Sequence, residues 1–246
     1  MNAPSRLSLS GLAVAGLTAA SSLTLASSAN AATVTFNFGS LPIDGALCVS
    51  NCVVAGTRLH DIFDGGVELQ AQGYNSSDAP AWLTQKPSSV NPADESGLGQ
   101  STLGTGPSNR AFEIEPKEFT LLDERNAEAH GWTPTSLSIT SIQRGEGAII
   151  YGYNGPEGSG ADLIPSDLVK LGTLTGAGGV LQDFSLIGHK FDAYVVTASA
   201  GNVLVDNDAL TKAIPEPATW VMMAAGFAFL GFLGFRQTRQ APRSLA

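Results

Sequence analysis

The C-terminal segment of the chain contains an uncharged apolar run that ends in a cluster of arginines. The run covers the 18 residues 218–235, and Arg236, Arg239 and Arg243 follow it. Helical residues rise about 1.5 Å each, so a helix of this length approaches the ~30 Å hydrocarbon core of a bilayer. Arginines beyond such a helix favour keeping that end in the cytoplasm. We therefore predict one membrane-spanning helix with a cytoplasmic arginine anchor, with a buried C-terminal helix as the alternative.

A proline-flanked tripeptide stands immediately before the apolar run. Pro215, Glu216 and Pro217 form the tripeptide, and Trp220 follows three positions later. The two prolines disfavour helix and leave an extended, accessible segment outside the membrane. The ordered tripeptide, apolar run and arginine-rich end resemble the PEP-CTERM sorting signal of Gram-negative bacteria, although Val221 stands where alanine is usual.

This resemblance implies a route of export. It implies that an exosortase, a membrane transpeptidase-like enzyme, processes the chain near Pro215, Glu216 and Pro217. It also implies that the chain lies in the inner membrane during export and is then delivered to the cell surface or to an exopolysaccharide matrix. The partners expected from it are the exosortase, the membrane and exopolysaccharide.

The N-terminal end has the pattern of a signal peptide. Arg6 precedes an apolar stretch over residues 7–26 that is rich in Leu, Ala, Ser and Thr. The segment Ala29–Ala31 then has the small-x-small pattern of a signal-peptidase site. We predict cleavage between Ala31 and Ala32, with an uncleaved transmembrane helix as the alternative.

These assignments divide the chain into a signal peptide (1–31), a body (32–214) and a sorting and anchor segment (215–246). Four of the 13 Lys and Arg residues lie in the two flanking segments, against one of the 22 acidic residues. The body therefore has 9 basic and 21 acidic residues and a net charge of −12. Such a charge excludes nucleic acid and anionic lipid as partners of the body.

Apolar and polar residues alternate with a period of two in the body, which predicts β-strands. Val34, Phe36 and Phe38 begin the pattern, and clusters of Gly, Pro, Asn and Asp divide the later runs. We predict further strands at Val67–Ala71, Ala111–Glu115, Glu118–Leu122, Leu137–Ile142, Ala148–Tyr153, Phe184–Ile187, Ala193–Ala198 and Val203–Val205. Many short strands with such turns indicate an all-β fold, either a sandwich or a barrel, and we predict a jelly-roll-like β-sandwich. One or two helical turns are expected at Asp123–His130, and a long surface excursion over Ser76–Ser108.

Pieces of the body also resemble ectodomains that precede the same sorting signal. The similar pieces are Asp94–Gly99, Asn109–Glu115, Ser138–Gln143 and Ala198–Leu204. The resemblance is loose and implies a β-sandwich of unspecified ligand.

The two cysteines, Cys48 and Cys52, favour a local disulfide in an exported protein. A loop this short gains on the order of 2 kcal/mol or less from the crosslink. Redox catalysis prefers a two-residue spacing, and metal ligation needs partners, of which the nearest histidine is His60. His60, beside Asp61 and Asp64, is expected to be a structural or surface histidine rather than a metal ligand or an acid/base group.

The carboxylates offer candidates for catalysis and for Ca²⁺ binding. A glycosidase needs two acids that flank the scissile bond, and Glu113, Glu115 and Glu118 lie close enough in sequence to be considered. Glu113 and Glu115 alternate with apolar residues, so both are expected to face solvent. Candidate Ca²⁺ ligands, without EF-hand spacing, are Asp61, Asp64, Gly65, Asp206, Asn207 and Asp208. We predict no catalytic residue, no metal site and no cofactor, with bound Ca²⁺ as the alternative.

An exposed aromatic side chain could stack on a sugar ring, and Trp82 is the main candidate. It lies in the polar, proline-flanked sequence Ala79–Leu83, which we interpret as a loop. Other candidates, equally consistent with a core position, are Trp132, Tyr74, Tyr151 and Tyr153.

We interpret the chain as a noncatalytic structural or adhesive component of biofilm or exopolysaccharide. The alternatives are a secreted polysaccharide-acting hydrolase and a glycan- or Ca²⁺-binding module.

Overall fold

The computed structural model describes residues 31–46, 50–54, 59–91, 95–101, 113–156, 162–176, 181–214, 223–232 and 235. The strands in these residues are β1 (Ala31–Asn37), β2 (Cys52–Val54), β3 (His60–Asp64), β4 (Val67–Tyr74), β5 (Pro80–Lys86), β6 (Gly97–Ser101), β7 (Phe119–Asp123), β8 (Thr133–Thr140), β9 (Gly147–Tyr153), β10 (Leu168–Thr175), β11 (Gln182–Ser185), β12 (Ala193–Ala200) and β13 (Leu204–Ala213). The helical elements are α1 (Arg125–Ala129) and the 3₁₀ turn η2 (Pro165–Asp167).

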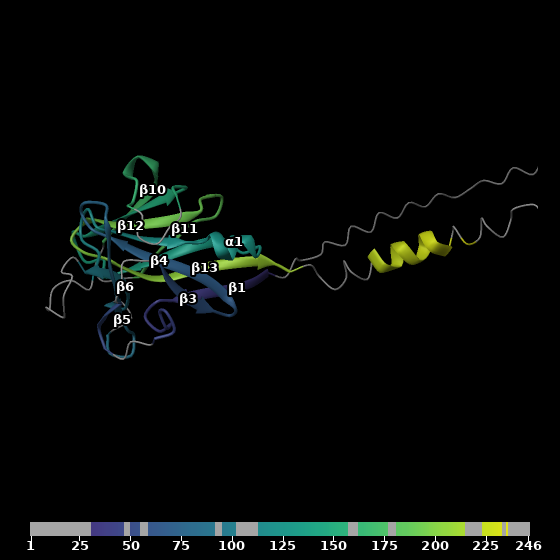
Figure 1. The fold of residues 1–246 in the computed structure, drawn as a ribbon, viewed down its shortest axis with the longest axis horizontal. Coiled ribbons are helices and arrows are strands. Elements are labelled where there is room, and N and C mark those ends of the chain that lie inside the picture. The colour runs from purple at the N-terminus through teal and green to yellow at the C-terminus, as the bar shows by residue number, and fades with distance from the viewer. Residues whose placement is uncertain are drawn as a thin grey trace, which may run out of the picture. The chain divides into compact units, whose positions relative to one another are not determined.

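The strands join in one continuous sheet, drawn in Figure 1. Its order is β10-β9-β12-β7-β4-β5-β6-β13-β8-β11, with β1 against β13, β2 against β5 and β3 against β4. The two halves meet at β5, whose residues 80 and 81 pair with β4 while residues 82–86 pair with β6. The all-β prediction is confirmed. Because the strands form one sheet, the more specific prediction of a jelly-roll-like sandwich stays a prediction.

Side chains from both halves of the sheet share one core. Phe36 of β1 and Leu137 of β8 come from one half, and Leu69 of β4 and Tyr194 of β12 come from the other; all four are fully buried in the same cluster. A second, smaller cluster contains Val195 of β12. β12 is therefore buried on both faces, which explains its nearly continuous apolar sequence. Burial of this kind is the main favourable term in folding.

The expected surface excursion over Ser76–Ser108 is wrong. This segment contains β5 and β6, which lie inside the sheet order, and Leu83 and Leu98 are fully buried. Their strands have no clean apolar alternation because polar side chains are buried beside them. Gln85 is an example: its amide nitrogen donates to the carbonyl oxygens of Phe38 at 2.6 Å and Leu41 at 2.8 Å.

Other sequence predictions are confirmed or shifted locally. The helical turn expected at Asp123–His130 is α1. The strand expected at Ala111–Glu115 is reduced, in the described residues, to an isolated bridge between Ile114 and Val203. Trp82 lies half-buried in β5 rather than in a loop.

In the C-terminal segment, residues 223–232 are helical and exposed. In the part of the chain that the structure describes, no helix combines the length and the apolarity needed to cross a membrane. The predicted span over residues 218–235 also includes residues 218–222, 233 and 234, which lie outside the described residues.

Candidate functional site

The two ends of the folded body lie on neighbouring strands. β1 pairs with β13 from Ala31 opposite Ala213, through Ala32 opposite Lys212, to Asn37 opposite Asn207. Figure 1 shows these two strands side by side. Residues opposite each other in an antiparallel ladder are about 5 Å apart at their Cα atoms. The predicted signal-peptide site therefore lies beside the end of β13, at one edge of the body.

The structure describes only some of the predicted site residues. Ala31 and Ala32 begin β1, and Cys52 begins β2. Residues outside the described part are Cys48, Pro215, Glu216, Pro217, Arg236, Arg239 and Arg243. The pairing of Cys48 with Cys52 stays a prediction. Ile214 alone separates Ala213, the last residue of β13, from the proline-flanked tripeptide.

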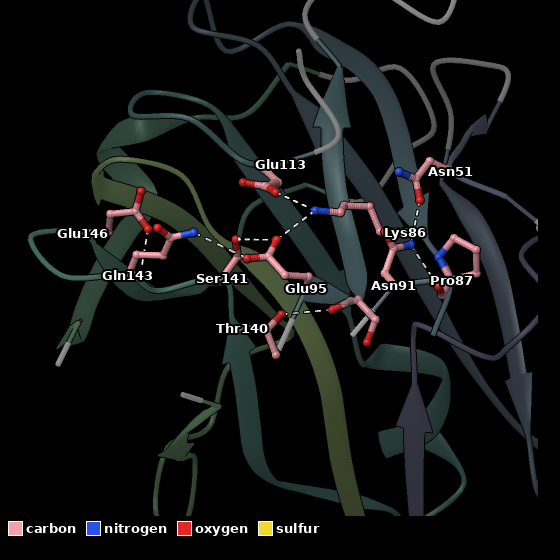
Figure 2. Close-up of polar contacts among 11 residues, drawn as sticks. Asn51, Lys86, Pro87, Asn91, Glu95, Glu113, Thr140, Ser141, Gln143 and Glu146 are labelled. Carbon is pink, nitrogen blue, oxygen red and sulfur yellow. Dashed lines mark hydrogen bonds and ion pairs between the residues drawn. The ribbon is translucent and has the colours of Figure 1, made fainter. Parts of the chain in front are cut away.

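A lysine at the end of β5 organises a polar network, shown in Figure 2. Lys86 is 9 % exposed, and its Nζ lies 2.6 Å from Glu113 Oε1 and 3.0 Å from Glu95 Oε2. Glu95 also accepts from Ser141 Oγ at 3.2 Å and from Gln143 Nε2 at 3.5 Å. Burial alone would lower the pKa of Lys86, but the hydrogen bonds that its ammonium group donates to Glu113 and Glu95 raise it above its ordinary value.

This network corrects the prediction that Glu113 faces solvent. Its carboxylate is paired with Lys86, whereas Glu115 is exposed and Glu118 is buried. The three glutamates therefore do not form one group. Lys86 instead connects the end of β5 with Glu95, which precedes β6, and with Glu113. Through Glu95 the network reaches Ser141, which directly follows β8.

Replacing Lys86 with methionine is expected to lower the free energy of unfolding by about 1–3 kcal/mol. The change leaves the carboxylates of Glu95 and Glu113 without their shared cation. Urea unfolding would measure the loss, with Lys170→Met, an exposed lysine of β10, as the matched control. Equal stabilities of the two variants would contradict the structural role of the network.

Two fully buried carboxyl groups meet in the core. Asp208 lies on β13, and Glu124 directly precedes α1. Burial raises the pKa of Glu124 well above its ordinary value, and the charge of Asp208 adds to the rise. Burial also raises the pKa of Asp208 to about 6. Because both pKa values are raised, the folded state holds protons on this pair up to a higher pH than the unfolded chain does.

Two of the candidate Ca²⁺ ligands accept hydrogen bonds from neighbouring side chains. Asp61 Oδ1 accepts from Gln70 Nε2 at 2.7 Å, and Asp206 Oδ1 accepts from Ser96 Oγ at 3.3 Å. His60 is fully buried with its Nδ1 2.8 Å from Asp44 Oδ2, in agreement with a structural role. Among the described residues, no three His, Cys, Asp or Glu side chains are grouped so that they could hold a metal ion.

A cavity of about 350 Å³ opens between the β3–β4 hairpin, α1 and the end of β13. The residues that give it its chemical character are Phe63, Glu68, Asn126, His130, Trp132 and Lys212. The Asn126 amide donates to Glu68 Oε2, and Lys212 Nζ lies 5.9 Å from the centre of the Trp132 ring. This cavity contains Trp132 and not Trp82, the tryptophan that the sequence favoured. No sequence spacing links the hairpin, the helix and β13, because only the sheet brings them together.

The comparisons with known proteins concern the C-terminal segment. No curated protein matches the chain. Residues 213–240 match the PEP-CTERM protein-sorting motif. The match includes Pro215, Glu216 and Pro217 and extends beyond Arg239. The chain therefore carries a PEP-CTERM sorting motif, which marks it as an exported surface protein that depends on an exosortase.

Proposed function

We propose that this protein is a noncatalytic, structural or adhesive component of the cell surface or extracellular matrix of a Gram-negative bacterium. The C-terminal helix holds the chain in the inner membrane during export, and the exosortase then cleaves it near the proline-flanked tripeptide. The observation that carries the proposal is the sorting motif at residues 213–240, which begins at the last residue of β13. The last described strand of the body therefore ends where the matched motif begins.

The arrangement of the two ends supports a displayed body. Ala31 and Ala213 face each other across β1 and β13, so the leader and the sorting segment are attached at one edge. The shared core of side chains from both halves of the sheet favours the jelly-roll-like sandwich that we propose for this body.

The distribution of carboxylates supports contact rather than catalysis. A glycosidase places two acids about 5–10 Å apart across its substrate. Glu95 and Glu113 share the cation of Lys86. Among the described residues that line the cavity beside Trp132, Glu68 is the acid. A noncatalytic role is the simplest explanation for carboxylates arranged in this way.

Replacing Pro215, Glu216 and Pro217 together with alanine is expected to abolish exosortase processing. In cells that contain the exosortase, the parent chain should be found in the surface fraction with a mass that ends near Pro215. The variant should keep its C-terminal segment and stay in the inner membrane, since the recognition motif is lost. Fractionation with intact-mass measurement reads both outcomes.

The body offers a matched control for this experiment. Pro156 and Glu157 form a second proline–glutamate pair, outside the sorting motif. Alanine at both positions should leave processing and fractionation unchanged. A parent chain that is retained uncleaved in the inner membrane of exosortase-containing cells would contradict the proposed route and indicate a permanent anchor.

A further inference from the structure

We propose that the cavity beside Trp132 is a saccharide-binding site for a neutral sugar unit. At about 350 Å³ its volume lies at the lower end of the ~300–1,000 Å³ that small-molecule sites occupy. One wall is aromatic: Phe63 is 55 % exposed, and Trp132 is half-buried, packed against the core. The other walls are polar and come from β4, α1 with the turn after it, and β13.

The polar walls present mostly hydrogen-bond acceptors. Glu68 accepts from Asn126 Nδ2 at one oxygen and from Gln70 Nε2, at 3.3 Å, at the other. A carboxylate can accept about four hydrogen bonds, so Glu68 retains capacity for a ligand. His130 Nδ1 lies 2.7 Å from the Asn126 carbonyl oxygen and must donate to it, which makes Nε2 of the neutral ring an acceptor.

The lining also contains a donor, the ammonium group of Lys212, which lies over the Trp132 ring. Acceptors at Glu68 and His130 with a donor at Lys212 suit a ring that carries several hydroxyl groups, since each hydroxyl can donate and accept. The apolar face of such a ring would pack on the aromatic wall.

Other ligand classes fit this lining less well. An anion would be repelled by Glu68, and the body as a whole is acidic. An apolar ligand would cover Glu68 and Lys212 without offering them hydrogen bonds, at a desolvation cost. The polyhydroxylated ring is the class that satisfies both charges and both aromatic side chains.

This inference rests on the proposed function, since noncatalytic contact with a matrix requires a site that binds a sugar without cleaving it. It lies near the edge where the body is attached: Lys212 pairs with Ala32 and precedes Ala213, the last residue of β13. The same sugar chemistry occurs in a polysaccharide and in a glycolipid headgroup. The experiment therefore tests a soluble oligosaccharide and a glycolipid vesicle separately.

The test uses the full chain, purified in a detergent whose headgroup carries no sugar. Saturation-transfer NMR is recorded with methyl β-glucopyranoside, methyl β-galactopyranoside and methyl N-acetyl-β-glucosaminide, each at about 10 mM. Glucuronate serves as the anionic probe. The variants are Glu68→Gln and Trp132→Leu, with Glu115→Gln and Trp82→Leu as matched controls outside the cavity.

At least one neutral glycoside is expected to give a transfer signal with a millimolar Kd. Glu68→Gln should weaken this binding about tenfold, because a charge-assisted hydrogen bond is lost. Trp132→Leu should abolish it, and both control variants should bind like the parent. Since Trp132 also packs against the core, the Glu68→Gln result decides the matter if Trp132→Leu fails to fold.

Several results would overturn the proposal: no signal from any neutral glycoside, stronger binding of glucuronate, or equal binding by Glu68→Gln and Glu115→Gln. Binding of cellotetraose that depends on Glu68 would support a polysaccharide as the source. Glu68-dependent binding only to vesicles that contain a galactolipid would support a glycolipid. Release of methanol from a bound methyl glycoside would support the sugar-binding site but would contradict the noncatalytic function.

Discussion

Lowering the pH from about 8 to about 5 is expected to stabilise the folded body. Burial raises the pKa of Asp208 to about 6 and the pKa of Glu124 well above its ordinary value. The folded state therefore binds protons more tightly than the unfolded chain. This contribution to stability is complete below the unfolded-state pKa of about 4, and it is lost as the pH rises through the folded-state pKa values.

The size of the effect follows from the shift of Asp208. A rise of roughly two pKa units corresponds to a contribution on the order of 3 kcal/mol. Burial also raises the pKa of Glu118 to about 7 and that of Asp206 to about 6, so these groups change stability in the same direction. Urea unfolding at the two pH values would measure the sum.

The Asp208→Asn variant separates the contribution of the buried pair to the pH dependence from that of the other acids. The amide keeps a hydrogen-bonding group beside Glu124 and removes one titrating carboxyl, so unfolding at about pH 8 should require more urea and the pH dependence should become weaker. Asp162→Asn, at an exposed aspartate, is the control and should leave both unchanged. A parent protein that is more stable at the higher pH, or an Asp208→Asn variant with the parent's pH dependence, would contradict this assignment.

The sequence predicted those strands that have one apolar face and one polar face. Val34 and Phe36 alternate with polar residues, and β1 indeed buries both. The same pattern located β4, β8, β9 and β12 to within a few residues. Prolines at 215 and 217 cannot continue a strand ladder, and β13, the last strand in the described residues, ends at Ala213.

The sequence could not predict the strands that bury polar side chains. Thr84, Gln85 and Gln100 of β5 and β6 are fully buried, so the sequence of these strands resembles a polar surface segment.

Asp208 was misinterpreted for a related reason. The alternation that buries Leu210 also buries Asp208 and Asp206, and extending this period-two pattern backward from Leu210 would have placed both carboxyls inside.

The candidate sugar site was out of reach of sequence reasoning because its parts are far apart along the chain. Glu68, Trp132 and Lys212 meet only after β4 and β13 take their positions in the sheet. Trp82 was preferred because its neighbours are polar and include proline, but those neighbours form β5. Local composition predicts exposure poorly when a strand lies in the middle of a sheet.

Replacing Phe36 with alanine is expected to lower the free energy of unfolding by about 3–5 kcal/mol. Phe36 is fully buried and lies opposite Asp208 in the β1–β13 ladder, so its ring contributes to the dry environment that raises the pKa of Asp208. The variant should therefore also weaken the acid stabilisation, because water would reach the carboxyl pair. Phe63→Ala removes the same ring from a position that is 55 % exposed and should change stability by about 0.5 kcal/mol or less. Urea unfolding would measure both variants. If Phe36→Ala and Phe63→Ala lowered the free energy of unfolding equally, β1 would not pack against the core beside β13, the strand that precedes the sorting motif.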